Sequence, residues 1–346
     1  MTIGTNQDTT AHKNASSGTQ SFSFLQTHLH MIGYTCVVPQ STNQSWTTRG
    51  LLAWMNNAFE KNDLDSPRRM AEMLMAHVLG VERLKLYMDQ DRPASPLERD
   101  QLRGLVKRAL DHEPIQYLVG EESFFTMRFK VDPRVLIPRP STQTIVEEVL
   151  QHARKNPDDN TLRDSDAGRG IMIADICTGS GCIAAALAKH LPGARIIASD
   201  ISQDALDCAK ENIELHDFID RIELVQGHLL EPIENHPVAG SAGALRYLVS
   251  NPPYIPDSEW EAVEANVKNH EPTLALRAKD DGMEFVSPLI ERGPVLLSSG
   301  GLLLIELASI RAPQALDLAT NHPDLTQAHI AKDSDGLDRV LIATKI

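Results

Sequence analysis

The sequence is short of several residue types, and each shortage excludes a class of protein. It has 4 cysteines in 346 residues, with no CxxC pair and no zinc-ligand spacing. Such cysteines are typical of reduced thiols, so we expect a cytoplasmic protein without a metal site. No apolar run approaches the roughly 18 residues of a membrane span, and the N-terminus lacks the basic-then-apolar order of a signal peptide. We therefore expect no membrane partner.

Positive charge is also scarce. Asp and Glu number 47, against 33 Lys and Arg, and the formal net charge is −14 at pH 7. A protein that coats nucleic acid through the phosphates needs a basic face, so we expect no direct nucleic-acid partner. Apolar residues, by contrast, are plentiful, and hydrophobic residues make up 42% of the chain. That is enough for real cores, and the length suits about two domains.

Composition divides the chain into four parts. Residues 1–45 are rich in Ser, Thr, Asn and Gln, which predicts a disordered tail that is dispensable for stability and activity. Apolar residues recur at helical spacing over residues 46–112, which predicts a small helical domain. Residues 113–141 include a β-rich stretch, and we expect a connector hairpin there. The remainder, residues 142–346, is the largest part.

Two predicted helices in residues 46–112 carry start and stop signals. Ser66 is the expected N-cap of a helix that begins with Pro67 and stops at Gly80. The other helix opens with a capping box of Ser95 and Glu98, again with proline at the first helical position. Both helices are therefore expected to have defined ends.

In residues 142–346 strands and helices alternate. Apolar strands without internal alternation are predicted at residues 171–176, 194–200, 222–227, 247–250, 301–308 and 339–346. Helices are predicted at residues 142–155, 182–191, 202–216, 288–300 and 311–321, with a charged loop at 156–170. This order indicates an α/β fold with a mostly parallel sheet covered on both faces. Ligands of such sheets bind beyond the carboxyl ends of the strands.

The first predicted strand runs into the stretch DICTGSGCIA. Asp175 closes the strand, and a tight turn then leads into a helix through Thr178, Gly179, Ser180 and Gly181. Glycine allows a ligand to approach the backbone closely, and a helix N-terminus offers free N–H groups. The turn is neither GxGxxG nor a P-loop, and alone it could be a plain strand–helix turn.

The second predicted strand ends in an acid, Asp200, 25 residues after Asp175. An acidic residue about 20 positions beyond a glycine turn suits a ribose, because one carboxylate can accept from both hydroxyls. The alternative role is an N-cap of the next helix, although Ser202 is the better candidate for that cap.

The fourth predicted strand runs into VSNPPYIP, residues 249–256. Proline cannot continue a central strand, and the residue before a proline is held extended. A stiff loop is therefore expected to lift Asn251 and Tyr254 off the strand end. In isolation this could be a proline-stiffened turn.

A glycine turn, an acidic strand end and NPPY, in this order, resemble the class I S-adenosyl-L-methionine-dependent methyltransferases. An (D/N/S)PP(Y/F) motif at this place marks members of that class that methylate a nitrogen in a planar group. In this resemblance the Asn251 side-chain oxygen and the Pro252 carbonyl accept the two N–H bonds of the substrate amide. Tyr254 can pack on the flat substrate group. Methyl transfer would then be promoted chiefly by positioning, which can supply on the order of 7–11 kcal/mol.

Over about residues 47–346 the chain resembles the HemK/PrmC family of protein-(glutamine-N5) methyltransferases. The motifs that carry the resemblance occur in order: EPIQYLVG, VLIPRPSTQ, DICTGSGCIA, NPPYI, HEPTLAL, DGMEF and GGLLLIELA. It implies a Rossmann-like methyltransferase domain, preceded by a helical domain that grips the substrate. It also implies S-adenosyl-L-methionine as cofactor, and the GGQ loop of peptide chain release factors as substrate. We expect a monomer.

The resemblance implies specific site residues. The catalytic and substrate-binding residues would be Asn251, Pro252, Pro253 and Tyr254. The cofactor would be held by Cys177, Thr178, Gly179, Ser180, Gly181, Asp200, Leu229 and Asn251. Glu306 matches a strand-end acid near the pocket, with a sheet-edge polar residue as the alternative.

Some positions depart from the family pattern. Cys177 stands where glycine is frequent, and Ser141 and Gln143 stand where acids are usual. His228 and Leu229 replace an acid and an aromatic residue near the adenine, so the adenine contacts at this point stay open. His228 could bind the base or be a plain loop residue.

Three other functions fit parts of the pattern. One is methylation of a glutamine in a large-subunit ribosomal protein, and another is methylation of adenine N6 in DNA. The third is a non-catalytic module that binds translation factors. The charge of −14 disfavours DNA, and the intact NPPY beside Asp200 disfavours a non-catalytic module.

Overall fold

The computed structural model describes residues 46–156, 170–279 and 281–346. The predicted tail at residues 1–45 lies outside the described residues, as does most of the loop predicted at 156–170. Among the described residues, no helix has the length and apolar character needed to cross a membrane.

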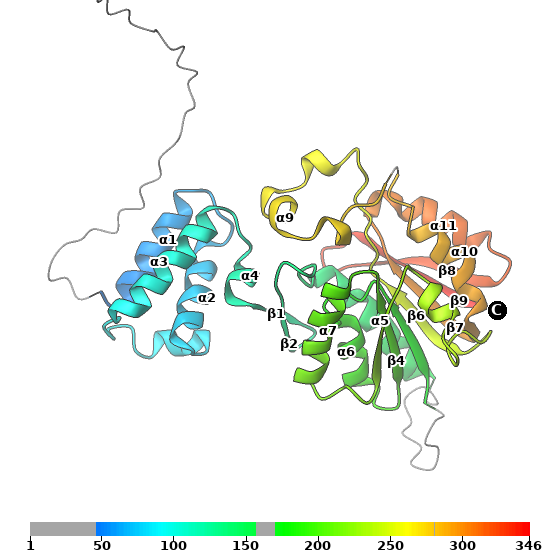
Figure 1. Ribbon diagram of the computed structural model, residues 1–346. Coiled ribbons are helices and arrows are strands. Elements are labelled where there is room, and N and C mark those ends of the chain that lie inside the picture. Colours follow the sequence, from blue (N-terminus) through cyan, green and yellow to red (C-terminus); the bar gives the residue numbers. More distant parts are fainter. Residues whose placement is uncertain (1–45, 157–169, 280) are drawn as a thin grey trace, which may run out of the picture. The chain divides into compact units, whose positions relative to one another are not determined.

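The N-terminal described part is helical, as predicted (Figure 1). It consists of α1 (Thr48–Glu60), α2 (Pro67–Leu79), a 3₁₀ turn (Arg83–Tyr87) and α3 (Pro96–Leu110). The helices bury one face each in a shared cluster, whose members include Leu51, Met55, Phe59, Leu74, Met75, Leu102 and Val106. The apolar periodicity of the sequence is thus the inner face of a small helical layer.

The predicted helix ends are confirmed in position, with Ser66 at the N-cap and Pro67 at the start of α2, but Ser66 makes no side-chain cap. The Ser95 hydroxyl accepts from the Glu98 N–H at 3.2 Å, and the Glu98 carboxylate accepts from the Ser95 N–H at 2.7 Å. Gly80 ends α2 in the left-handed region with φ of 62°. Ser66 does not cap α2 through its side chain. Its own φ of 50° is left-handed, whereas a capping side chain needs extended backbone at that position.

An antiparallel hairpin lies in the connector region. It is formed by β1 (Glu121–Phe124) and β2 (Met127–Lys130), and it follows a short helix, α4 (Ile115–Val119). Phe125 and Thr126, the two residues of its turn, have φ of 47° and 65°. Two successive left-handed residues make a turn whose twist matches that of the paired strands.

The remaining strands form one seven-stranded sheet in the order β5-β4-β3-β6-β7-β9-β8. They are β3 (Met172–Ile176), β4 (Arg195–Asp200), β5 (Ile222–Gln226), β6 (Leu245–Ser250), β7 (Leu297–Glu306), β8 (Leu325–Lys332) and β9 (Asp338–Lys345). β3 to β7 are mutually parallel, and β9 is antiparallel to both of its neighbours. The predicted architecture is confirmed: an α/β fold with a mostly parallel sheet, preceded by helices.

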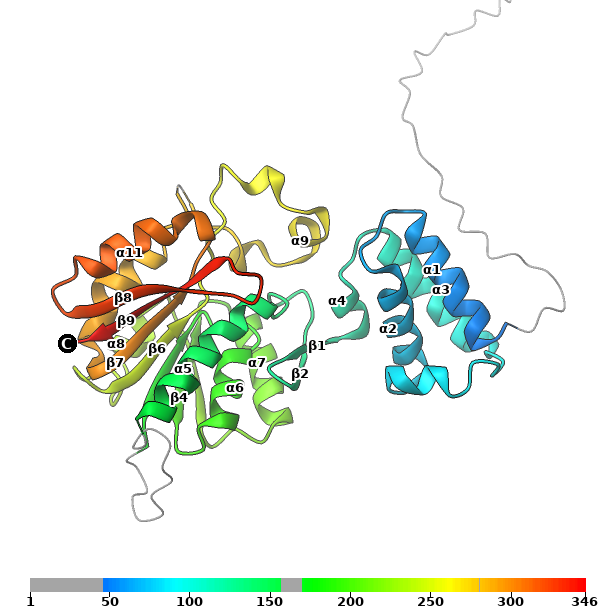
Figure 2. The ribbon, with the colours of Figure 1, turned by 180° about the vertical axis from the view of Figure 1, so that it is seen from behind.

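Helices cover both faces of the sheet (Figures 1 and 2). One buried cluster joins α5 (Gln143–Lys155), α6 (Cys182–His190) and α7 (Gln203–Leu215) to strand residues such as Ile173 and Tyr247. The other joins α8 (Glu231–Glu234), α10 (Val286–Arg292) and α11 (Ala312–Thr320) to Ala174 and Leu248. Neighbouring strand residues thus face opposite clusters, which explains why the strands are apolar without alternation.

The structure differs from the predicted elements at residues 288–300 and at β8, and it has short helices, such as α4 and α8, that were not predicted. The helix predicted at 288–300 ends at Arg292, a 3₁₀ turn follows at Gly293–Val295, and β7 begins at Leu297. Pro294 cannot donate within a helix, and Leu297 pairs with Leu245 of β6. The edge strand β8 was not predicted, because half of its positions are exposed and polar.

The connection from β6 to α10 contains α9 (Ala265–His270) and several short turns. It begins directly after Ser250, at the carboxyl end of β6. The parallel strands β3, β4, β6 and β7 all end at the same edge of the sheet, at Ile176, Asp200, Ser250 and Glu306. This edge brings together the motifs found in the sequence.

Candidate active site

The glycine turn after β3 is built from left-handed residues. Cys177, Gly179 and Gly181 have φ of 60°, 54° and 76°. A Cβ atom on Gly179 would have no neighbour within 4 Å, whereas one on Gly181 would lie 3.2 Å from Cβ of Ala209. Gly179 therefore leaves open space beside the backbone, and Gly181 allows α7 to pack closely against the turn.

Asp200 ties the end of β4 to this turn. Its Oδ2 accepts from the Gly179 N–H at 2.9 Å, and its Oδ1 accepts from the Ser202 N–H at 3.0 Å. Burial raises the pKa of Asp200, and the backbone donors oppose part of that rise. The predicted cap is confirmed, because the Ser202 hydroxyl accepts from the Ala205 N–H at 3.2 Å. The Asp200 carboxylate is thus left at the site rather than used as a helix cap.

Asp175 lies below the turn and is fully buried. Its Oδ2 accepts from the Thr178 hydroxyl at 2.7 Å and from the Ala184 N–H at 3.2 Å. Among the described residues its Oδ1 has no hydrogen-bond partner. Burial raises the pKa of Asp175 to about 7, and the charge of Asp200 adds to the rise. The strand ends thus hold a fully buried carboxyl group, that of Asp175, and a half-buried one, that of Asp200.

The NPPY loop is anchored on both sides. The Ser250 hydroxyl donates to the Ile176 carbonyl at 2.8 Å, which joins the ends of β6 and β3. Beyond the motif, Ile255 exchanges backbone hydrogen bonds of 2.9 and 2.8 Å with Leu276 and Ala278. Nδ2 of Asn251 donates to Oγ1 of Thr142 at 3.1 Å. The amide of Asn251 is therefore held by a residue just before α5.

Two adjoining pockets lie at this edge of the sheet. The inner pocket is lined by residues that include Arg139, Thr142, Cys177, Thr178, Gly179, Ser180, Asp200, Asn251 and Pro253. The outer pocket is lined by residues that include Asp200, His228, Leu229, Pro253, Arg277 and Phe285. Three residues line both pockets: Cys177, Asp200 and Pro253. Asp200 therefore lies between the inner pocket, which Asn251 lines, and the outer pocket, which Leu229 lines.

The structure thus brings most of the predicted site residues together at the two pockets. Three of them do not line either pocket: Gly181, Pro252 and Tyr254. Pro252 is buried and Tyr254 is half-buried. Burial raises the pKa of the Tyr254 hydroxyl to about 12, so this group is neutral at ordinary pH. His228 is exposed, and its ring lies 6.2 Å from that of Phe285.

A buried ion pair holds one wall of the inner pocket. Glu271 accepts from the Ile137 N–H at 3.0 Å and from the Arg139 guanidinium. The Glu271 side chain is 1% exposed, and burial raises its pKa while Arg139 opposes the rise. Glu271 belongs to the HEPTLAL motif, but the sequence gave no indication of its partner Arg139, 132 positions away.

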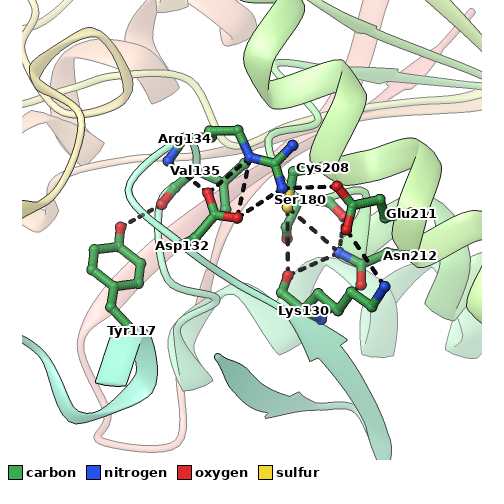
Figure 3. A network of polar contacts seen from close by, with 9 residues as sticks. All are labelled: Tyr117, Lys130, Asp132, Arg134, Val135, Ser180, Cys208, Glu211 and Asn212. Carbon is green, nitrogen blue, oxygen red and sulfur yellow. Dashed lines mark hydrogen bonds and ion pairs between the residues drawn. The ribbon is translucent and has the colours of Figure 1, made fainter. Parts of the chain in front are cut away.

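A second network joins the connector to the glycine turn (Figure 3). The fully buried Asn212 of α7 donates from Nδ2 to the carbonyls of Lys130 and Ser180, at 3.0 and 2.9 Å. Its Oδ1 accepts from the Lys130 N–H at 2.7 Å. Arg134 of the connector donates to Glu211, the residue before Asn212, at 2.9 Å. The sequence analysis missed Asn212, although its spacing from Cys208 and Ala209 places it on the buried face of α7.

Glu306 is a further buried acid at the strand ends. It is 0% exposed, and its Oε1 accepts from the Ser141 hydroxyl at 3.2 Å. Burial raises the pKa of Glu306, whereas the hydroxyls of Thr142 and Ser141 and the charge of Arg339 oppose the rise. Glu306 thus lies beside the Thr142–Asn251 contact.

Within the described ranges there is no group of three or more His, Cys, Asp or Glu residues that could hold a metal ion.

Comparison with known proteins gives two family-model matches and many relatives. Residues 50–120 match the PrmC N-terminal domain, and residues 160–274 match the methyltransferase small domain. A release factor glutamine methyltransferase of Chlorobaculum tepidum is 39% identical, over 86% of this chain and 96% of its own length. The protein of the same name from Geobacter sulfurreducens is 35% identical over the same shares of the two chains. Its namesake from Rhodopirellula baltica is 36% identical, over 88% of this chain and 98% of its own length.

These relatives match over nearly their whole length. The resemblance that the sequence motifs indicate is therefore confirmed. The chain belongs to the release factor glutamine methyltransferase family.

Proposed function

We propose that this protein transfers a methyl group from S-adenosyl-L-methionine to the side-chain amide nitrogen, N5, of the glutamine in the GGQ motif of peptide chain release factors. The observation that carries the proposal is that Asn251 of the NPPY loop lines the same pocket as the glycine turn and Asp200. Family membership over almost the whole chain supports the same activity.

The residues of the two pockets fit S-adenosyl-L-methionine. Each oxygen of Asp200 accepts one backbone N–H, and a carboxylate has about four lone-pair positions, so it can also accept from a ribose diol. Gly179 leaves the backbone open on the pocket side. The outer pocket offers apolar groups from Leu229 and Phe285 to a flat base. We infer that Cys177, Thr178, Ser180 and Gly181 complete this half of the site.

Charge supports the same cofactor. Asp200 lines both pockets, and among the described residues the groups that act on its pKa are backbone donors. A carboxyl group in this situation favours a positively charged ligand. The cofactor carries a sulfonium and an ammonium group, so its charge suits the strand ends.

When bound, the cofactor supplies an electrophilic methyl group on its sulfonium. An amide nitrogen is a poor nucleophile, because its lone pair is delocalised into the carbonyl. We infer that Oδ1 of Asn251 and the backbone carbonyl of Pro252 accept the two N–H bonds of the glutamine amide and hold its nitrogen in place. Pro252 and Pro253 fix the backbone of the loop, so that these acceptors need no reorganisation. Tyr254 is proposed to contact the flat amide group.

We propose separate roles for the helical domain (46–112) and the methyltransferase domain (142–346), which the connector (113–141) joins. The helical domain would bind the release factor, and the methyltransferase domain would bind the cofactor and perform the transfer. We propose that the protein acts in the cytoplasm as a monomer. The alternative substrates are a ribosomal protein glutamine and a DNA adenine.

The proposal is tested by offering all three substrates to the purified protein with S-adenosyl-L-methionine labelled in the methyl group. A release factor, large-subunit ribosomal proteins and adenine-containing DNA are incubated separately, and label in each is counted. We expect label in the release factor and none in a release factor whose GGQ glutamine is replaced by alanine. Label in the ribosomal proteins or the DNA instead would overturn the substrate assignment.

A further inference from the structure

The side chain of Asn251 has a donor end and an acceptor end, and a half-turn of the amide group exchanges them. In the structure the donor end is fixed, because Nδ2 donates to Oγ1 of Thr142 at 3.1 Å. Thr142 is 3% exposed and ends the 3₁₀ turn Pro140–Thr142, directly before α5. The contact spans 109 positions of the chain. It leaves Oδ1 as the end of the amide that can accept from a substrate.

The hydroxyl of Thr142 could equally donate to Oδ1 of a rotated amide, and the buried carboxyl group of Glu306 bears on which arrangement forms. Glu306 accepts from the Ser141 hydroxyl at 3.2 Å, and the Thr142 hydroxyl opposes the rise that burial causes in the pKa of Glu306. An ionised carboxylate accepts and cannot donate. If Glu306 accepts from the Thr142 hydroxyl, only the lone pairs of Oγ1 face Asn251, and these accept from Nδ2 and repel Oδ1.

A rotated amide would also oppose the reaction. The nitrogen of a primary amide substrate carries two N–H donors. If the NH₂ end of Asn251 faced that nitrogen, donors would meet donors, and the substrate would lose one of the acceptors that hold it.

We propose that Thr142 is a positioning residue for methyl transfer, whose hydroxyl holds Asn251 with Oδ1 toward the substrate nitrogen. This inference rests on the proposed function, because it assigns a role in the reaction at the same pocket. It assigns a role to a residue of the VLIPRPSTQ motif for which the sequence indicated none. Thr142 acts through Asn251.

The first test compares Thr142→Val, which keeps the shape and removes the hydroxyl, with Thr142→Ser, which keeps the hydroxyl. Single-turnover methylation of a release factor is measured beside the cofactor Kd and the melting temperature. We expect Thr142→Val to lower the rate about tenfold or more, the effect of one lost hydrogen bond, and to change the cofactor Kd less than about threefold. Thr142→Ser should restore most of the rate.

Ser141→Ala is the matched control, because it removes the other hydroxyl bound to Glu306 without touching Asn251. Its rate should stay nearer to the wild-type rate than that of Thr142→Val does. A Thr142→Val rate within about threefold of wild type would overturn the proposal, and so would a Thr142→Ser rate as low as that of Thr142→Val.

The second test is a double-mutant cycle with Asn251→Ala. If Thr142 acts through Asn251, adding Thr142→Val to Asn251→Ala lowers the rate little further, so the two effects are not additive. Additive effects would show that Thr142 acts independently and would contradict the proposal. The wild-type rate separates this inference from the proposed function: without methylation by the wild type, the proposed function itself fails.

Discussion

The backbone N–H of Gly179 donates a hydrogen bond of 2.9 Å to the carboxylate of Asp200, 21 positions further along the chain. This contact joins the turn after β3 to the end of β4. It places an acceptor-rich carboxylate beside a glycine that leaves the backbone open. The two features that the sequence shows as separate motifs are therefore one structural unit.

Asp200→Ala should weaken cofactor binding. The substitution removes the proposed acceptor of the ribose hydroxyls and leaves the Gly179 and Ser202 N–H groups without their partner. Losing hydrogen bonds to a charged group costs about 1–3 kcal/mol. Titration calorimetry with S-adenosyl-L-methionine measures the effect. Asp204→Ala, an exposed acid in the first turn of α7, is the control and should bind normally. Equal affinities of Asp200→Ala and wild type would disprove the ribose assignment.

Asn251→Ala should impair methyl transfer far more than cofactor binding. Removal of one preorganised polar group at a reaction centre typically lowers kcat by about 10²–10³. The loop should keep its shape, because Pro252 and Pro253 are buried and unchanged. Single-turnover rates, measured beside a cofactor titration on the same variant, check this. A rate within about threefold of wild type would mean that Asn251 is only a turn residue.

Asp175→Asn should change the pH dependence of stability. The pKa of Asp175 is about 7 in the folded protein and about 3.8 in the unfolded chain. The folded state therefore binds the proton more tightly, and the wild type loses stability as pH rises from about 4 to 7. Asparagine has no such proton. Relative to wild type, the variant's free energy of unfolding should rise by a few kcal/mol over that window and level off above it. Urea unfolding at several pH values measures the difference, and a pH-independent difference would contradict the assignment.

Asn212→Ala should destabilise the folded protein. It removes three hydrogen bonds, two with the backbone of Lys130 and one with the buried carbonyl of Ser180. At about 1 kcal/mol for each bond, we expect a loss of about 2–4 kcal/mol in the free energy of unfolding. The exposed Asn235→Ala is the control and should stay within about 0.5 kcal/mol. Equal unfolding midpoints for the two variants would show that the network in Figure 3 contributes little.

Local features of the fold could be predicted from the sequence because they depend on near neighbours. Apolar strands followed by Gly179 or by Pro252 define the strand ends, and the Ser95–Glu98 box defines a helix start. The same reasoning failed at residues 288–300, where Pro294 and the pairing of Leu297 with β6 override an apolar helical pattern. It also missed β8, which is an exposed edge strand.

The candidate site could be predicted only where its residues belong to motifs. The contacts that complete it join distant parts of the chain: Thr142 with Asn251, Ile137 with Glu271, and Ser141 with Glu306, across 109, 134 and 165 positions. No periodicity or local spacing encodes such pairs. Arg139 and Thr142 belong to the VLIPRPSTQ motif, but their partners emerge only from the structure, as does Asn212. The roles assigned to the motif residues stay proposals.

Mass spectrometry of the GGQ-loop peptide is the most direct test of the central claim. A release factor is incubated with the protein and S-adenosyl-L-methionine, digested, and the peptide is fragmented to locate any added methyl group. The account predicts one methyl group on the side chain of the GGQ glutamine with the wild type, and a strongly reduced amount with Asn251→Ala. An unmodified glutamine, or a methyl group on another residue, would contradict it.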